Sequence, residues 1–137
     1  MDPEDVVYVL RNMIGAVEPC GLIFDLQVIR PDPVVEAAGK VVCEIDGSQL
    51  FRMADAAAVA LDAAVRDGVL SEEARDDHDV REHYATGAEL IESFAAKKRK
   101  LPVAAMPQLR QLGSCAVRDS CRLRRLRVAS AARISVA

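Results

Sequence analysis

Hydrophobic positions near the start of the chain predict a helix, a tight turn and a buried strand. From Val6 to Val17, apolar residues recur every three or four positions and form one stripe along a helix. Acidic residues precede this stripe, as is typical of a helix start, and Pro19 with Gly21 ends it. Residues 22–29 then form a nearly continuous apolar run, which is typical of a strand buried between helices.

The rest of the chain alternates between strand and helix patterns. Ala38-Gly39 is a turn signal between two apolar runs. Thr86 with Glu89 three positions later is a capping box, which predicts a helix start. In chain order we predict a stiff turn over residues 30–33, a hairpin over 34–45, a helix over 50–66, an edge strand over about 72–83, a helix from Thr86 to the cluster 97–100, a short helix over 104–112 and a strand over 115–128.

This order predicts an α/β fold with a small mixed sheet flanked by helices and with antiparallel late strands. We expect a single domain over residues 1–128 and a frayed tail over 129–137. The chain has 137 residues, of which 51% are hydrophobic, and this is enough for a core. No apolar run approaches the roughly 20 residues that span a bilayer, and no secretory signal is recognisable. We therefore expect a cytoplasmic protein without membrane contact.

The charges are distributed unevenly along the chain. Residues 1–95 contain 7 Lys or Arg and 20 Asp or Glu, whereas residues 96–137 contain 11 and 1. An anion or an acidic partner is one candidate contact for the cations, and pairing of the arginines with the acidic strand 72–82 is the alternative. The basic segment lacks aromatic residues for base stacking and the chain is acidic overall, so nucleic acid is the less favoured partner. The candidate contact residues are Lys97, Lys98, Arg99, Lys100, Arg122, Arg124, Arg125 and Arg127.

Few residues suggest chemistry. The four cysteines form no Cys-X-X-Cys pair, so we expect reduced, structural thiols and no metal site. His78 and His83 are five positions apart, which places them on opposite faces of a strand, and we assign no catalytic residue. Asp25 is the one charge in the apolar run 22–29 and is a candidate pocket residue, since ligands of α/β sheets gather beyond strand ends. Alternatively, a backbone N–H or an arginine satisfies it.

The segment Val17-Glu18-Pro19-Cys20-Gly21, between an amphipathic helix and an apolar strand, resembles a motif of the class I S-adenosylmethionine-dependent methyltransferases. Cys20 stands where that motif usually has glycine. The element order over residues 4–128 is similar to the carboxyl-terminal half of this family, in which the last two strands pair antiparallel. The resemblance therefore implies half of a Rossmann-like fold.

The resemblance also implies what this chain lacks. The family's glycine-rich cofactor loop and its acidic partner residue are not found, and the seven glycines are scattered singly. The resemblance thus implies a domain that is not catalytically self-sufficient and binds no cofactor alone. S-adenosylmethionine would bind only if a partner completed the site, as in a bipartite enzyme.

The missing half also leaves the strand 22–29 without its usual neighbour. An apolar strand with an open edge pairs with another chain or aggregates, so we expect a homo-oligomer through this edge. A small binding protein that uses its basic carboxyl-terminal segment for nucleic acid or an acidic partner is the alternative.

Overall fold

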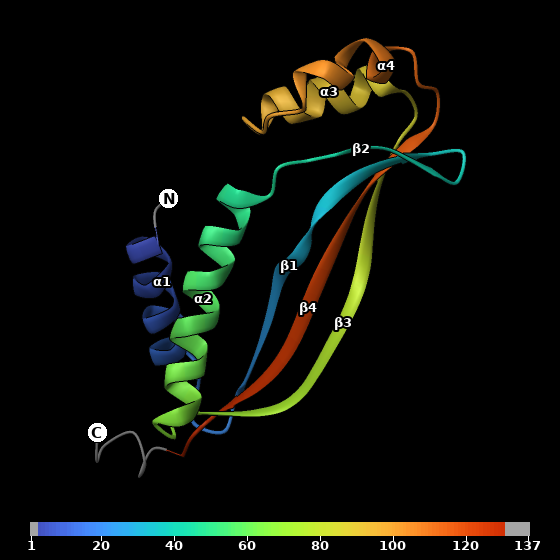
Figure 1. The fold of residues 1–137 in the computed structure, drawn as a ribbon. Coiled ribbons are helices and arrows are strands. Elements are labelled where there is room, and N and C mark those ends of the chain that lie inside the picture. Colours follow the sequence, from blue (N-terminus) through green and yellow to red (C-terminus); the bar gives the residue numbers. More distant parts are fainter. Residues whose placement is uncertain (1–2, 131–137) are drawn as a thin grey trace. The chain divides into compact units, whose positions relative to one another are not determined.

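A computed structural model describes residues 3–130 and contains both helices and strands (Figure 1). The predicted α/β composition is confirmed. In chain order the elements are α1 (Pro3–Ala16), β1 (Leu22–Ala37), β2 (Lys40–Glu44), α2 (Ser48–Arg66), β3 (Leu70–Tyr84), α3 (Gly87–Ala96), the 3-10 turn η1 (Val103–Ala105), α4 (Met106–Arg110) and β4 (Cys115–Val128).

The four strands form one antiparallel sheet in the order β2-β1-β4-β3. β4 comes last in the chain but lies between β1 and β3, so the predicted antiparallel pairing of the last two strands is confirmed. The expected mixed sheet is wrong. β1 and β3 run in the same direction, but β4 separates them and is antiparallel to both, so no two neighbours are parallel.

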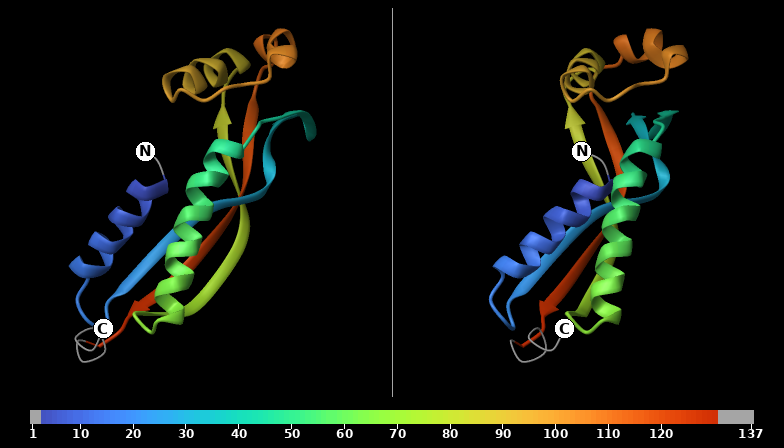
Figure 2. Two further views of the ribbon diagram at one scale, coloured as in Figure 1. Left: turned by 60° about the vertical axis from the view of Figure 1, so that its left-hand side comes forward. Right: turned by 90° about the vertical axis from the view of Figure 1, so that its left-hand side faces the viewer.

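The chain divides into two compact units, and the long strands β1, β3 and β4 contribute to both. Of the described residues, the first unit contains 3–28, 49–77 and 121–130, and the second contains 29–48 and 78–120. α1 and α2 pack on the same face of the sheet in the first unit (Figure 2). Its buried core consists of Leu10, Ile23, Ala57, Leu61, Leu70, Leu126 and Val128.

In the second unit, α3 and α4 cover the sheet. Thr86 caps α3: its hydroxyl accepts a hydrogen bond from the backbone N–H of Glu89 at 3.2 Å. The predicted N-cap at Thr86 is therefore confirmed. The Glu89 carboxylate accepts from the N–H of Ala85, the residue before the cap, at 3.1 Å, whereas a capping box would have it accept from the N–H of Thr86. The core of this unit consists of Val35, Ile45, Tyr84, Leu90, Phe94, Leu109, Cys115 and Val117.

Two predicted elements differ from the structure. The turn predicted over residues 30–33 is wrong, because β1 continues through it to Ala37. Proline biases the chain toward extended geometry, and its missing N–H is tolerated in a strand that lacks a partner on one side. The helix predicted over 104–112 is shorter in the structure, where α4 covers only Met106–Arg110 and follows the separate turn η1. Pro107 lies in the first turn of α4, the part of a helix in which proline is tolerated. Of the predicted frayed tail, residues 131–137 lie outside the described residues.

The connection from α1 to β1 is a tight turn over Glu18–Gly21. The N–H of Gly21 donates to the carbonyl of Glu18 at 2.8 Å. With Pro19 in the second position and Cys20 in the third at φ 66°, this is a type II turn. A Cβ on Gly21 would lie 2.6 Å from the Val17 side chain, so glycine is required there. Cys20, in contrast, is an L-residue in a conformation that favours glycine.

We expect Cys20→Gly to raise the free energy of unfolding by about 0.5–1 kcal/mol. The substitution relieves the strain of about 1–2 kcal/mol that an L-residue has in the left-handed conformation. Glycine also makes the unfolded chain more flexible, and this offsets part of the gain in stability. Urea titration measures the difference. Cys20→Ser is the matched control, since it removes the thiol but keeps the Cβ, and an equal gain from serine would contradict the backbone explanation.

Candidate interaction edge

The first part of β1 has a neighbouring strand on one side only. β2 pairs with residues Val34 to Ala37, and the carbonyl of Pro33 accepts a hydrogen bond from the N–H of Ile45 at 2.7 Å. β4 lies on the other side of β1. Among the described residues 3–130, no strand pairs with residues 22–29 on the side that β2 occupies farther along. This open edge therefore offers backbone donors and acceptors to another strand.

Apolar side chains line the open edge on the face away from α1 and α2. Ile23 and Asp25 are buried on the helix-covered face. Leu22, Phe24 and Leu26 alternate with them along the strand and are 40%, 60% and 54% exposed. Three large apolar side chains in one exposed row are typical of an interaction surface rather than of a solvated strand.

A groove of about 300 Å³ follows the same edge on the helix-covered face. Its other wall is α1, whose Tyr8, Val9 and Met13 are 67%, 42% and 44% exposed. Tyr8 and Val9 lie outside the predicted helical stripe. Apolar residues outside the stripe are the feature of the sequence that indicates a second apolar surface on α1. The residues that line the groove are Val6, Val9, Leu10 and Met13 of α1, residues 23–27 of β1, and Ala57 of α2.

Asp25, the candidate pocket residue, lines this groove and is 8% exposed. Its carboxylate accepts a hydrogen bond from the side-chain amide of Gln27 at 2.8 Å. The partner is thus an amide two residues away on the same strand, not the backbone N–H or arginine considered from the sequence. Asp25 and Gln27 therefore lie beside the open edge as a hydrogen-bonded polar pair in a groove whose other lining residues are apolar.

The opposite edge strand, β3, has a different character. It lies at the end of the sheet, and almost all of its residues are exposed. Charged side chains along an edge oppose its pairing with another chain, so β3 is protected, whereas the open edge of β1 is not. The charged residues of β3 are Glu72, Glu73, Arg75, Asp76, Asp77, Asp79, Arg81 and Glu82.

The arginines of β4 pair with the carboxylates of β3. Arg122 forms two hydrogen bonds to Asp77, at 2.8 and 3.0 Å. Arg125 and Arg127 both contact Glu73, at 3.3 and 2.7 Å. The expectation that this basic strand pairs with the acidic strand is therefore confirmed. To bind an external anion, these guanidinium groups would have to share or give up their carboxylates.

Arg124 is the buried member of the series, with only 4% of its side chain exposed. It donates to Glu72 at 2.6 Å and to Asp62 of α2 at 2.9 Å. Glu72 also accepts from Arg75 of its own strand at 2.7 Å. Hydrogen bonds from Arg75 and from Arg124 hold the pKa of Glu72 below its ordinary value, so the carboxylate stays charged. Arg124 thus joins β4, β3 and α2.

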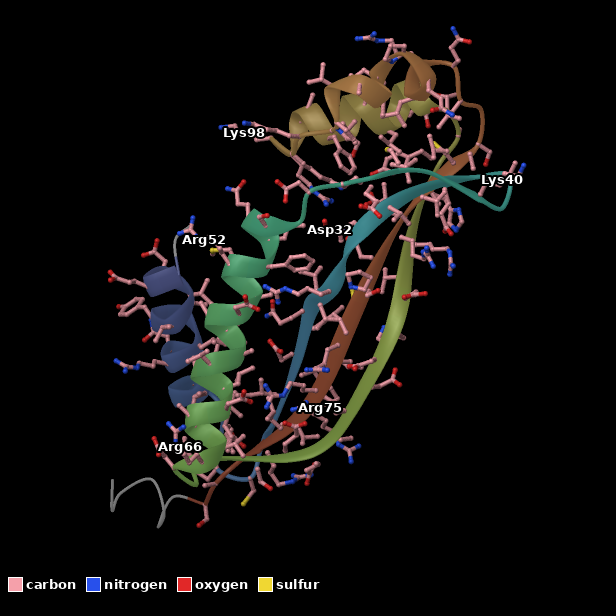
Figure 3. The ribbon with its side chains drawn as sticks, viewed as in Figure 1. Asp32, Lys40, Arg52, Arg66, Arg75 and Lys98 are labelled. Carbon is pink, nitrogen blue, oxygen red and sulfur yellow. The ribbon has the colours of Figure 1, made fainter. Side chains whose placement is uncertain are left out.

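The other predicted cations belong to the second unit. Lys97 donates to Glu82 at 3.2 Å, and the guanidinium of Arg99 lies 4.5 Å from the centre of the Phe94 ring. The Lys98 side chain points away from the end of α3 (Figure 3), and Lys100 is exposed. Their contact with an anion or an acidic partner stays a prediction.

The remaining candidate groups show no reactive arrangement. Burial raises the pKa of the thiols of Cys43 and Cys115, and the four cysteines are free thiols. His78 and His83 are exposed on β3. Within residues 3–130, no group of three or more metal-ligating side chains could hold a metal ion. No helix in the same range is long and apolar enough to cross a membrane.

We expect Arg124→Ala to lower the free energy of unfolding by about 2–3 kcal/mol, because it removes the buried guanidinium and its hydrogen bonds to the carboxylates of Glu72 and Asp62. Arg122→Ala is the matched control on the same strand. Its ion pair with Asp77 is partly exposed, so we expect a loss of about 1 kcal/mol or less. Urea titration of both variants provides the measurement, and equal losses would contradict the role assigned to Arg124.

No protein-family model, no curated protein and no solved structure matches this chain.

Proposed function

We propose that the chain is a methyltransferase-like domain that lacks the cofactor-binding half, is not catalytically self-sufficient, and acts by joining the open edge of β1 to a strand of another chain. The order of elements supports this proposal: α1, the type II turn and β1 match the helix, turn and strand of the resemblance. The antiparallel neighbours β3 and β4 agree with its last two strands.

The open edge over residues 22–29 is the observation that carries the proposal. The resemblance implies that this strand has a neighbour from the cofactor-binding half. The described residues leave that side of β1 unpaired and place Phe24 and Leu26 beside it in an exposed apolar row. A strand from elsewhere would satisfy the backbone groups and cover the row in one step.

The described glycines support the second part of the proposal, that this chain does not bind the cofactor alone. Gly39 and Gly68 have positive φ values of 75° and 78° and each occupies a turn. Gly87 packs so closely on the carbonyl of Leu109 that a Cβ would overlap it. Gly21 is enclosed by the turn that contains it. Each of these glycines thus has a structural role, and none belongs to a phosphate- or nucleoside-binding loop.

The alternative function, binding of nucleic acid or an acidic partner by the basic segment, has less support. Arg122, Arg125 and Arg127 each contact a carboxylate of β3, and Arg124 is buried. Phosphate contacts would have to compete with these ion pairs.

We expect the purified chain to show no saturable binding of S-adenosylmethionine in a calorimetric titration, because it supplies no glycine-rich loop for the cofactor. A thermal unfolding curve of the same sample, cooperative and unchanged by the cofactor, is the control for a folded domain. Tight binding of S-adenosylmethionine by a monomeric chain would contradict the proposal.

A further inference from the structure

We infer that the strand that joins the open edge is β1 of a second copy of this chain, antiparallel and related by a two-fold axis at Leu26. This inference rests on the proposed function and names its partner. The resulting dimer would have one continuous sheet of eight strands, twice the four of a single chain. Such an interface is isologous, so the same residues must complement themselves.

The edge itself has the composition of a strand that pairs. Residues 22–29 contain neither proline nor lysine, which are the residues that usually protect an edge. Their one charge, Asp25, points to the helix-covered face. A charge that points inward opposes any register that buries it against an apolar group or a second carboxylate. Asp25 therefore selects among the registers that two copies can adopt.

Only residues on the same face can be opposite each other when the two-fold axis is perpendicular to the sheet. An axis at Asp25 would place two carboxylates face to face, and an axis at Phe24 would place Asp25 opposite Ile23 of the second copy. An axis at Gln27 would place Asp25 opposite Ile29. With the axis at Leu26, Asp25 lies opposite Gln27 of the second copy, and Gln27 lies opposite Asp25.

This register satisfies both faces of the strand pair. Gln27 uses one amide N–H for Asp25 of its own chain, at 2.8 Å, and has a second N–H for the carboxylate of the second copy. On the other face, Leu26 meets Leu26 and Phe24 meets Val28 of the second copy, so two residues of the exposed apolar row gain apolar neighbours, and Leu22 lies opposite Arg30. The groove beside α1 borders the same edge and would be covered by the same interface.

Light scattering of the purified chain across a dilution series tests the association. We expect the mass of a dimer for the unmodified chain and of a monomer for Leu26→Lys, which places two like charges directly opposite each other at the axis. The Leu26 side chain is 54% exposed in one chain, so the substitution should leave the fold intact. Val59→Lys on α2, at a site that is 70% exposed and does not line the groove, is the matched control and should remain dimeric.

Oxidative cross-linking tests the register. In a Cys20→Ser background, which removes the exposed native thiol, Leu26→Cys should form a disulfide-linked dimer. Opposite residues of an antiparallel pair have Cα atoms about 4.5–5.5 Å apart, within the range of a disulfide. Phe24→Cys is the control: its two copies lie about 14 Å apart in this register and should not cross-link. Cross-linking at position 24 but not at 26 would overturn the register.

The outcomes separate this inference from the proposed function. A chain that is monomeric at every concentration overturns the second copy as the occupant. If that monomer also fails to bind S-adenosylmethionine, the proposed function stands and the edge belongs to a different chain. If that monomer binds the cofactor tightly, the inference and the proposed function fail together.

Discussion

The fold depends on the placement of an arginine-rich strand, β4, in the interior of the sheet. Both cores contain residues of β4: Cys115 and Val117 in one, Leu126 and Val128 in the other. A guanidinium buried as deeply as that of Arg124 costs several kcal/mol unless carboxylates neutralise it. The acidic strand β3 and the helix α2 supply these carboxylates. The positive charges of the β4 arginines are therefore balanced by acidic residues of the same chain.

The two edges of the sheet are treated in opposite ways. β3 is long and exposed, but its charged side chains make pairing with another chain unfavourable. The open part of β1 has no such protection and combines free backbone groups with the apolar row of Leu22, Phe24 and Leu26. The two edges therefore differ in how readily each could pair with a strand of another chain.

The methyltransferase resemblance and the antiparallel sheet are compatible because of where β4 lies. β1 and β3 run in the same direction, as strands linked by a helical crossover do, and the last strand separates them. The part of the sheet that would carry the cofactor has no counterpart in the described residues. The described residues form two cores and leave one edge at which the sheet can be extended.

The sequence by itself determined the local elements. The N-cap at Thr86, the turn at Ala38-Gly39 and the apolar stripes act over a few residues, so their patterns are readable without the fold. Only the tertiary structure decided that β4 lies between β1 and β3. It also decided which arginine is buried: Cys121 is buried at an odd-numbered position of β4, whereas Arg124, Leu126 and Val128 are buried at even-numbered positions. Strict alternation would bury Arg125 instead. The order of the strands, and the choice of which face of a strand is buried, depend on hydrogen bonds and packing between segments far apart in the sequence. Local patterns do not encode these contacts.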